Sequence, residues 1–331
     1  MSVVVPELIC PAGTPAALRA AVEAGADAVY LGFRDATNAR NFPGLNFDER
    51  EFGDGLAFAR ARGCKVFVAI NTYPAAGRAE LWHAAIDRAA DAGADAVILA
   101  DLGLLDYAAT RHPGLRRHLS VQASASNADA IGYFRDTFGI ARVVLPRVLT
   151  MADIAALIRE VGVETEVFAF GGLCVMAEGR CALSSYATGQ SPNSNGVCSP
   201  ASHVRYQRDG GNLVSRLGAF TINKVGDGLP AGYPTLCKGR FMAGGGTDHL
   251  FEEPVSLDVI GVLARFAEIG VRALKIEGRQ RGRAYVTRVV GAYRRALDAL
   301  ARGEAPEDTG VLDAMSEGQR KTAGAYLKSW H

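Results

Sequence analysis

The feature that most constrains the fold is a six-residue pattern that occurs twice. Ala24-Gly25-Ala26-Asp27-Ala28-Val29 and Ala92-Gly93-Ala94-Asp95-Ala96-Val97 each follow an amphipathic stretch and open an apolar run. A glycine just past a helix favours the left-handed conformation that ends helices. A continuous apolar run is typical of a parallel strand that is buried on both faces. The pattern therefore predicts one helix–strand unit that is used repeatedly.

Eight short apolar runs predict strands, and most stretches between them carry apolar residues at helical spacing. The predicted strands are Glu7–Cys10, Ala28–Phe33, Lys65–Asn71, Ala96–Asp101, His118–Ser124, Arg142–Arg147, Thr165–Phe170 and Ala273–Glu277. The predicted helices are Pro15–Ala24, Asp48–Ala61, Arg78–Ala92, Leu102–Arg111, Asn127–Phe138, Met151–Val161 and, at the end, Arg283–Arg302. Eight such steps favour an α/β fold of the closed (β/α)8, TIM-like barrel type over an open sheet. No Gly-x-Gly-x-x-Gly follows the first strand, which argues against a dinucleotide-binding fold.

One connection is much longer than the others. The chain runs from Phe170 to Ala273 between the seventh and eighth strands, far more than an ordinary β/α loop needs. We therefore predict three parts. Residues 1–170 form barrel strands 1 to 7 with their helices, residues 171–272 form a cysteine-bearing insertion, and residues 273–331 form strand 8, a closing helix and a C-terminal tail.

Four of the six cysteines lie in the predicted insertion, with the spacing Cys174-x6-Cys181-x16-Cys198-x38-Cys237. Structural zinc sites usually pair cysteines two to four residues apart, and this spacing contains no such pair. Four thiolates without a nearby histidine suit an iron–sulfur cluster better, while zinc and unligated thiols remain alternatives. Cys10 and Cys64 flank apolar strands and are expected to be buried small side chains.

Composition and the N-terminus bear on compartment and partners. The N-terminus lacks the features of a signal peptide and no apolar run approaches the length of a membrane span, so we expect a cytoplasmic protein without stable membrane insertion. Thiols stay reduced in that compartment, which favours metal ligands over disulfides. Lys and Arg number 36 against 35 Asp and Glu, a net charge of +1. We therefore expect no overall attraction of nucleic acid, although a local basic groove is left open.

Polar side chains stand at or near the C-terminal ends of the predicted strands, where barrels of this type carry their active sites. Strand alternation suggests that these runs point inward: Phe67-Ala69-Asn71, Val97-Leu99-Asp101, Ser120-Gln122-Ser124, Val143-Leu145-Arg147 and Ala273-Lys275-Glu277. The candidate catalytic residues are Lys275, Glu277, Gln122 and Asn71. The candidate substrate-binding residues are Arg147, Arg279, Arg40 and Asn38, because a guanidinium presents a two-pronged donor to a carboxylate or phosphate.

Each of these residues has a structural alternative. Asp101, directly before Leu102, is the clearest case of a helix cap, and Lys275 with Glu277 can form an internal salt bridge. Convergence of the whole set favours a site. A hydrolase finds no support, because the six histidines form no motif with a cysteine or with Gly-x-Ser-x-Gly.

Several motifs resemble a known family. They are Leu8–Gly13, Gly25–Tyr30, Ser120–Ser124, Val143–Leu149, Val167–Gly171, Glu178–Cys181, Ala231–Arg240 and Lys275–Arg281. On these segments the chain resembles the collagenase-like peptidase family U32, and within it the members that act in ubiquinone biosynthesis. The resemblance extends over nearly the whole chain.

The resemblance implies a 4Fe-4S cluster held by Cys174, Cys181, Cys198 and Cys237. It implies oxygen-independent, anaerobic hydroxylation of a ubiquinone precursor, with prephenate as the hydroxyl donor and a paralogous iron–sulfur protein as the partner in a heterodimer. Related members hydroxylate tRNA or rRNA. RNA ranks second among the expected substrates for two reasons. The net charge is close to zero, and the chain ends at His331, before the extra C-terminal module of longer relatives. A non-catalytic electron-transfer or scaffold subunit is a further alternative, and peptidase activity ranks last.

Overall fold

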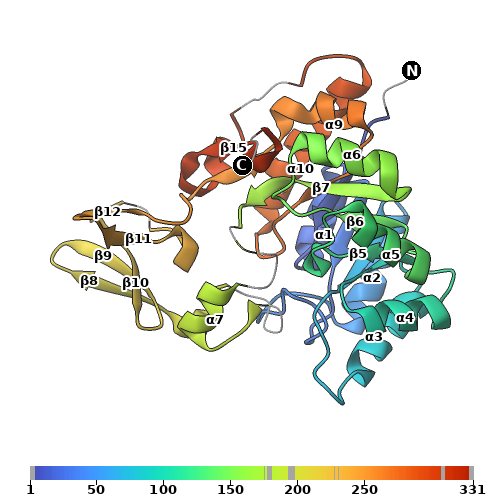
Figure 1. The fold of residues 1–331 in the computed structure, drawn as a ribbon, viewed down its shortest axis with the longest axis horizontal. Coiled ribbons are helices and arrows are strands. Elements are labelled where there is room, and N and C mark those ends of the chain that lie inside the picture. The colour runs from blue at the N-terminus through green and yellow to red at the C-terminus, as the bar shows by residue number, and fades with distance from the viewer. Residues whose placement is uncertain are drawn as a thin grey trace.

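Eight parallel strands close into a barrel with helices around it (Figure 1). The computed structural model describes residues 4–174, 176, 181–192, 198–226, 228–229, 231–306 and 310–327. The barrel strands are β1 (Glu7–Pro11), β2 (Ala28–Leu31), β3 (Lys65–Ile70), β4 (Ala96–Leu99), β5 (Arg116–Leu119), β6 (Arg142–Val144), β7 (Glu164–Gly172) and β14 (Ala273–Ile276). Each pairs with its neighbour in order, and β14 pairs in parallel with both β1 and β7, which closes the circle. The predicted fold class is confirmed.

Seven of the eight surrounding helices form where their sequence patterns predict them. The eight helices are α1 (Pro15–Glu23), α2 (Glu49–Arg60), α3 (Glu80–Asp91), α4 (Leu102–Arg111), α5 (Ala128–Phe138), α6 (Met151–Val161), α9 (Leu263–Ile269) and α10 (Arg283–Ala301). Gly25 and Gly93, from the repeated pattern, adopt φ of +98° and +77° just after α1 and α3. Helix α9 was not predicted, because its seven residues are too few for a clear helical period.

The barrel interior and the helix-facing layer are both apolar. Val97, Leu99, Val143 and Leu145 pack in the large core under the helices, whereas Ile98 and its neighbours form a separate small cluster. The predicted inward direction of Val97-Leu99-Asp101 and of Val143-Leu145 is therefore wrong. A parallel strand that is apolar on both faces does not reveal in its sequence which face is inside.

Other parts of the predicted alternation hold. Phe67 and Ala273 belong to the inner cluster, and Ala69 and Lys275 line the pocket above it. Asp101 is a helix cap, since its side chain accepts a hydrogen bond from the Leu104 N–H of α4 at 3.0 Å.

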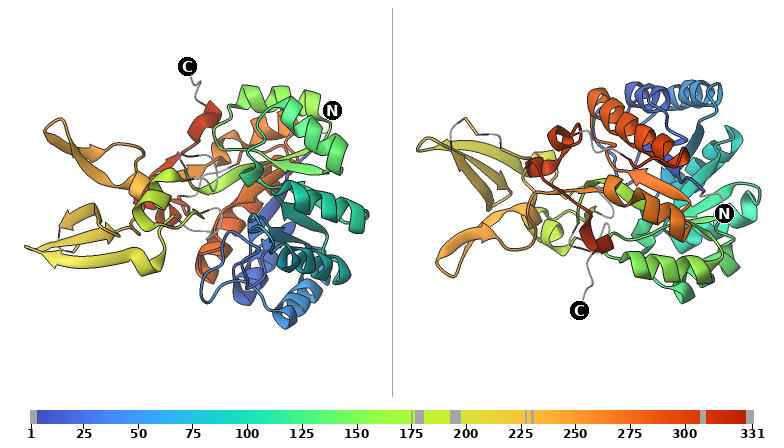
Figure 2. Two further views of the ribbon diagram at one scale, coloured as in Figure 1. Left: turned by 60° about the horizontal axis from the view of Figure 1, so that its bottom comes forward. Right: turned by 90° about the horizontal axis from the view of Figure 1, so that it is seen from above.

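Between β7 and β14 the chain builds additional elements. These are α7 (Ala182–Thr188), the antiparallel strands β8 (Val204–Asp209), β9 (Asn212–Leu217) and β10 (Phe220–Gly226), the hairpin of β11 (Arg240–Ala243) and β12 (Gly246–His249), and β13 (Ser256–Asp258). Strand β13 pairs with the end of β7, and β15 (Lys321–Thr322) pairs with β13. Both small sheets reach outward from the barrel (Figure 2). The three predicted parts and the two boundaries between them stay predictions.

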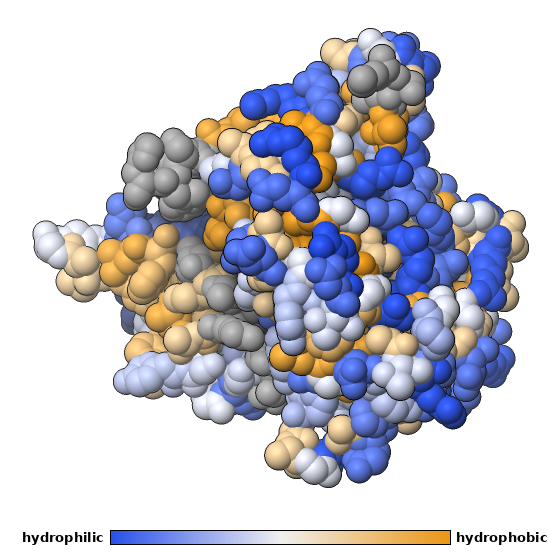
Figure 3. All heavy atoms as spheres, turned by 45° about the vertical axis from the view of Figure 1, so that its right-hand side comes forward, coloured by the Kyte–Doolittle hydropathy of each residue, from blue (hydrophilic) through white to orange (hydrophobic). Residues whose placement is uncertain are grey.

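No helix in the described part of the chain is long and apolar enough to cross a membrane. On the face seen in Figure 3, hydrophobic residues lie in small groups between hydrophilic ones. Scattered exposure of this kind is ordinary for a protein surface.

A buried ion network crosses the bottom of the barrel. Arg142 on β6 lies 2.6 Å from the Glu7 carboxylate of β1, 2.7 Å from Glu164 and 3.4 Å from Glu166 on β7. Glu166 also contacts the Lys275 ammonium of β14 at 2.6 Å. The side chains of Arg142 and Glu166 are only 3% and 1% exposed. Each charge therefore depends on its partners, because an isolated ion in such a place is very costly.

Removing the cation of this network should destabilise the fold. In Arg142→Met, the carboxylate of Glu166 loses one of its two partners, so we expect the free energy of unfolding to fall by about 3–5 kcal/mol. Urea denaturation followed by circular dichroism measures the change.

The control is Arg116→Ala. Arg116 also contacts Glu164, at 2.9 Å, but its side chain is 48% exposed, so its removal should cost under about 1 kcal/mol. Equal losses in the two variants would contradict a special role for the buried network.

Candidate functional site

A pocket opens at the C-terminal ends of the barrel strands and holds about 730 Å³ of empty space up to its open mouth. Its lining includes seven of the predicted residues, namely Asn71, Gln122, Arg147, Lys275, Glu277, Arg279 and Arg40. The eighth, Asn38, accepts a hydrogen bond from Arg279. The structure thus brings the predicted set together, and the role of each residue remains a prediction.

Glu277, just past β14, is held between two arginines. Arg147 contacts one carboxylate oxygen at 2.9 Å and Arg40 the other at 3.4 Å. Burial raises the pKa of Glu277, but the nearby Arg147 and Arg40 lower it more, so the net shift of this pKa is downward. Glu277 is therefore a charged carboxylate that orients two guanidinium groups toward the pocket. Arg147 also lies over the ring of Phe168, 3.5 Å from its centroid.

Lys275 points into the pocket from below. Its ammonium forms a salt bridge with Glu166 at 2.6 Å. The salt bridge predicted as a structural alternative had Glu277 as the partner of Lys275, so the carboxylate differs. The same ammonium lies 4.0 Å from the ring centroid of Tyr30, whose hydroxyl donates to the Ile276 carbonyl at 2.9 Å. These contacts fix a positively charged donor on the pocket floor.

Arg279 is a buried cation without a carboxylate partner in the described part of the chain. It donates to the side-chain oxygens of Asn38 and Asn46, and its Nε, fully buried, has no hydrogen-bond partner among the described atoms. Burial lowers its pKa to about 10, which leaves it charged at neutral pH. A charge in this environment is stabilised by a negative ligand. The pocket is thus suited to an anion.

Asn71 and Gln122 differ in what their side chains can do. The Asn71 amide oxygen accepts the Ala39 N–H at 3.0 Å and so fixes the loop after β2. Strand β5 ends at Leu119, earlier than predicted, and Gln122 lies in a short 3-10 turn. The Gln122 amide oxygen is buried and meets no donor in the described residues, so it is available to a ligand.

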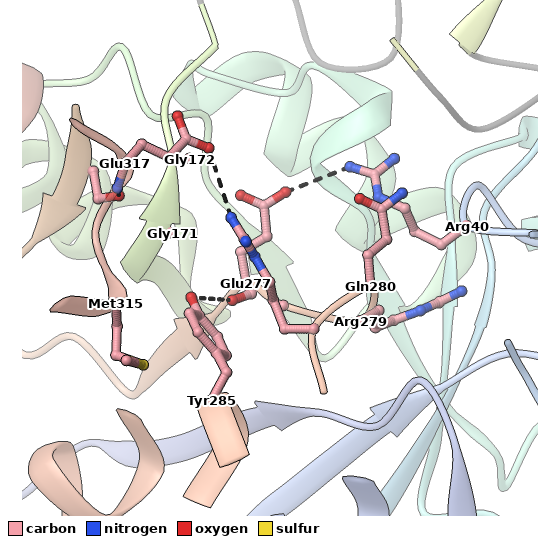
Figure 4. A pocket seen from close by; sticks show the side chains of 12 residues that line it. Arg40, Gly171, Gly172, Glu277, Arg279, Gln280, Tyr285, Met315 and Glu317 are labelled. Atoms are coloured by element: carbon pink, nitrogen blue, oxygen red, sulfur yellow. Dashed lines mark hydrogen bonds and ion pairs between the residues drawn. The ribbon is translucent and has the colours of Figure 1, made fainter. Parts of the chain in front are cut away.

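A second pocket adjoins the first and shares Arg40, Glu277 and Arg279 with it (Figure 4). Tyr285 donates to the Glu277 carbonyl at 3.3 Å on its far wall. Three contributing residues were not predicted: Tyr285, Tyr30 in the lining of the first pocket, and Glu166, which pairs with Lys275. Glu166 had a detectable signal, because it is a carboxylate inside an otherwise apolar strand.

Gly171, at the end of β7, makes room for Glu277. A Cβ added there would lie 2.5 Å from the Glu277 Cβ, and Gly171 has φ of +142°. Gly13 has a similar role beside Arg279, whose carbonyl oxygen would lie only 1.7 Å from an added Cβ. Both positions therefore require glycine to keep a site residue in place.

Two of the four clustered cysteines, Cys181 and Cys198, lie on segments that hydrogen bonds hold together. Cys237, in the short turn Leu236–Lys238, is buried, and burial raises its thiol pKa to about 12, with smaller upward contributions from Cys198 and Cys181. Ser184 of α7 links two of the segments, since its N–H donates to the Cys181 sulfur at 3.3 Å and its hydroxyl to the Cys198 carbonyl at 2.5 Å. Cys174 follows the end of β7.

The cysteine region also adjoins the second pocket. Lys238, next to Cys237, forms an ion pair with Glu317 of that pocket's lining. Among the described residues, no group of three or more histidine, cysteine, aspartate or glutamate side chains has the arrangement of a metal site. The motif residues 178–180 and 193–197 lie outside the described ranges. The predicted ligand set stays a prediction.

Adding one methyl group at Gly171 should disturb the site. In Gly171→Ala the new Cβ displaces Glu277 from Arg147, and the strained φ costs about 1–3 kcal/mol. A lower melting temperature, together with a crystal structure in which the Glu277–Arg147 contact is lost, is the expected result.

Gly53→Ala in α2 is the matched control. An added Cβ there meets no atom within 4 Å, and alanine in a helix is favoured by about 0.5–1 kcal/mol. This variant should melt at the same or a higher temperature. A Gly171→Ala protein as stable as Gly53→Ala would contradict the tight contact.

Comparison with known proteins gives one family and several relatives. A model of peptidase family U32 matches residues 13–329. The tRNA hydroxylation protein P of Escherichia coli is 32% identical, over 94% of this chain and 71% of that protein. A collagenase of Porphyromonas gingivalis is 28% identical, over 91% and 68%. The 23S rRNA 5-hydroxycytidine C2501 synthase of E. coli is 29% identical, over 95% of this chain but only 42% of that protein.

Proposed function

The chain belongs to peptidase family U32, and from this premise we propose that it is a hydroxylating enzyme that acts on a base of RNA. Two of the three relatives described above carry names of tRNA or rRNA hydroxylation. The net charge of +1 argued against RNA as the substrate. The charge within the pocket is a better guide than the net charge, since a ligand responds to the local field.

The observation that carries the proposal is the excess of positive charge at the barrel mouth. Glu277 is shared by Arg40 and Arg147, and the buried Arg279 has no carboxylate partner in the described chain. A base that is flipped out of an RNA strand brings its own phosphate to the rim of a pocket. Arg279 is well placed to receive that phosphate, because a guanidinium binds phosphate with two parallel hydrogen bonds.

The pocket also has groups that fit a base. The free amide oxygen of Gln122 accepts a hydrogen bond from a base N–H, as amides do when proteins read a base edge. Lys275, fixed by Glu166 at 2.6 Å, presents a charged hydrogen-bond donor on the pocket floor, and we assign to it a hydrogen bond to an oxygen of the ligand. Glu277 keeps the arginines in position.

We further propose a 4Fe-4S cluster held by Cys174, Cys181, Cys198 and Cys237, which supplies electron transfer when bound. The hydrogen bonds of Ser184 to the Cys181 sulfur and the Cys198 carbonyl support this assignment, as does the soft thiolate donor set. The ion pair between Lys238 and Glu317 of the second pocket's lining supports a cluster close to that pocket.

A second candidate is the anaerobic hydroxylation of a ubiquinone precursor, in a heterodimer with a paralogous iron–sulfur protein and with prephenate as hydroxyl donor. Arg147, Arg279 and Arg40 favour it, because three guanidinium groups suit a donor with two carboxylates. Peptidase activity has less support, since no histidine is among the described residues that line either pocket. An electron-transfer or scaffold role would not need the charged pocket.

The proposed substrate can be tested in a strain that lacks this protein. Wild-type protein should restore hydroxylated nucleosides in digests of tRNA and rRNA, measured by mass spectrometry. Arg279→Met should reduce them roughly 10-fold or more, because a charged hydrogen bond contributes about 1.5–3 kcal/mol.

Arg159→Met, at an exposed position in the last turn of α6, is the control and should behave as wild type. Quinones from anaerobic cultures are measured in parallel. Restoration of quinone without hydroxylated nucleosides supports the second candidate, and restoration of neither contradicts both. A fully active Arg279→Met protein would contradict the assigned role of the pocket.

The cluster has a separate test. Protein purified without oxygen should contain iron and acid-labile sulfide, and replacing Cys181 and Cys237 by alanine should remove both. The double variant Cys10→Ala, Cys64→Ala is the control, because these two buried cysteines lie at β1 and β3 and should leave the iron content unchanged. Zinc in place of iron, or iron retained after loss of Cys181 and Cys237, would contradict the proposal.

A further inference from the structure

The small sheet β8–β10 carries a row of cations on one face. Cross-strand partners of an antiparallel sheet share a face, and the register places Arg205 opposite Arg216 and Arg216 opposite Thr221. Lys224 lies on the same face, since it pairs with Val214, two residues from Arg216. The opposite face contributes Leu217 to the sheet's small apolar core. On the other face Arg205 and Lys224 are exposed and Arg216 is half-buried, while Val214 beside them is buried.

Arg205 and Arg216 form a pair of like charges, which by itself weakens a sheet. In the described structure, their guanidinium groups donate only to nearby backbone carbonyls: Arg205 to those of Ser202 and Val204 at 2.9 and 2.8 Å, and Arg216 to that of Ala219 at 2.8 Å. Neither makes an ion pair with a described carboxylate. An anion between them would remove the repulsion.

Lys224 extends the row but is only weakly neutralised. It lies 2.9 Å from Asp209, and the two side chains are 51% and 67% exposed. Water screens an exposed pair of this kind, so its contribution is small. Arg205, Arg216 and Lys224 therefore form a row of positive charges on one face of the sheet, here called the cationic strip.

The position of the strip suits a long, negatively charged substrate. The sheet reaches outward from the barrel (Figures 1 and 2). It is joined to the barrel through α7 and the turn Leu236–Lys238, which adjoins the second pocket. A small anion needs only the arginines of the pocket. An RNA strand whose base enters the pocket continues beyond it and has a phosphate at every nucleotide.

We propose that the cationic strip binds the sugar–phosphate backbone of the RNA substrate, outside the nucleotide that enters the pocket. This inference rests on the proposed RNA function and adds a second contact to it. Backbone contacts of this kind position a nucleic acid and contribute affinity without reading its sequence. The overall charge of +1 conceals the strip, because charge elsewhere in the chain compensates it.

The test compares two double variants of the full chain. The probe is total tRNA from a strain that lacks this protein, and binding is measured at several salt concentrations. In Arg205→Ala, Arg216→Ala we expect roughly tenfold weaker binding at low salt, and a slope of log affinity against log salt that is smaller by about 1–2, because each lost phosphate contact removes about 0.7–0.9.

Arg159→Ala, Arg302→Ala is the matched control. Both arginines are exposed and lie at the C-terminal ends of the barrel helices α6 and α10, the end away from the pocket. This variant should bind tRNA as wild type does. The Arg205, Arg216 variant should also melt no lower than wild type, because it loses a like-charge pair, which separates weak binding from misfolding.

The outcomes are distinct. If wild type binds tRNA and the Arg205, Arg216 variant binds equally well, the strip is not the contact, while the proposed function stands. If wild type neither binds tRNA nor restores hydroxylated nucleosides, the proposed function itself fails. If the strip arginines instead govern binding to phosphatidylglycerol vesicles and not to tRNA, the surface belongs to a membrane contact and the inference is overturned.

Discussion

The salt bridge between Lys275 and Glu166 is the interaction on which the site depends most. It fixes the Lys275 ammonium on the pocket floor at 2.6 Å from its partner, and Glu166 is held in turn by Arg142 from β6. Because Glu277 is only two residues from Lys275 on the same chain segment, the register of β14 that places the lysine also places the carboxylate between Arg40 and Arg147. The ion network at the bottom of the barrel is thus connected, through Lys275 and strand β14, to the charged residues at the mouth.

Close backbone packing supplies the second requirement. Gly13 lies just after β1, and Gly171 lies at the end of β7. At both positions the backbone comes close to residues that follow β14. These contacts bring Arg279 and Glu277 to the mouth from a segment that is far from β1 and β7 in the sequence. A site made of side chains from many strand ends therefore depends on positions that have no side chain at all.

The sequence predicts much of this architecture but not all of it. The helix-ending glycines and apolar runs identified all eight barrel strands, since these signals are local. The prediction of which face of β4 and β6 points inward was wrong. Val97 and Ile98 lie on opposite faces of β4 and are equally apolar, so the sequence does not show which face is inside. Arg147 still reaches the pocket, since β6 ends at Val144 and the chain turns before it. The partners of Lys275 and Arg279 could not be predicted, because each pair joins residues from distant segments whose spacing carries no signal.

The projecting sheet has a consequence for substrate selection. If the barrel pocket and the cationic strip hold the same molecule, the second contact forms within an already bound complex and benefits from a high effective concentration. A free nucleotide fills only the first contact and gains nothing from the second. Only a ligand long enough to reach from the barrel pocket to the sheet would then make both contacts. The length of the ligand, and not only the chemistry of its base, would determine how long it stays bound.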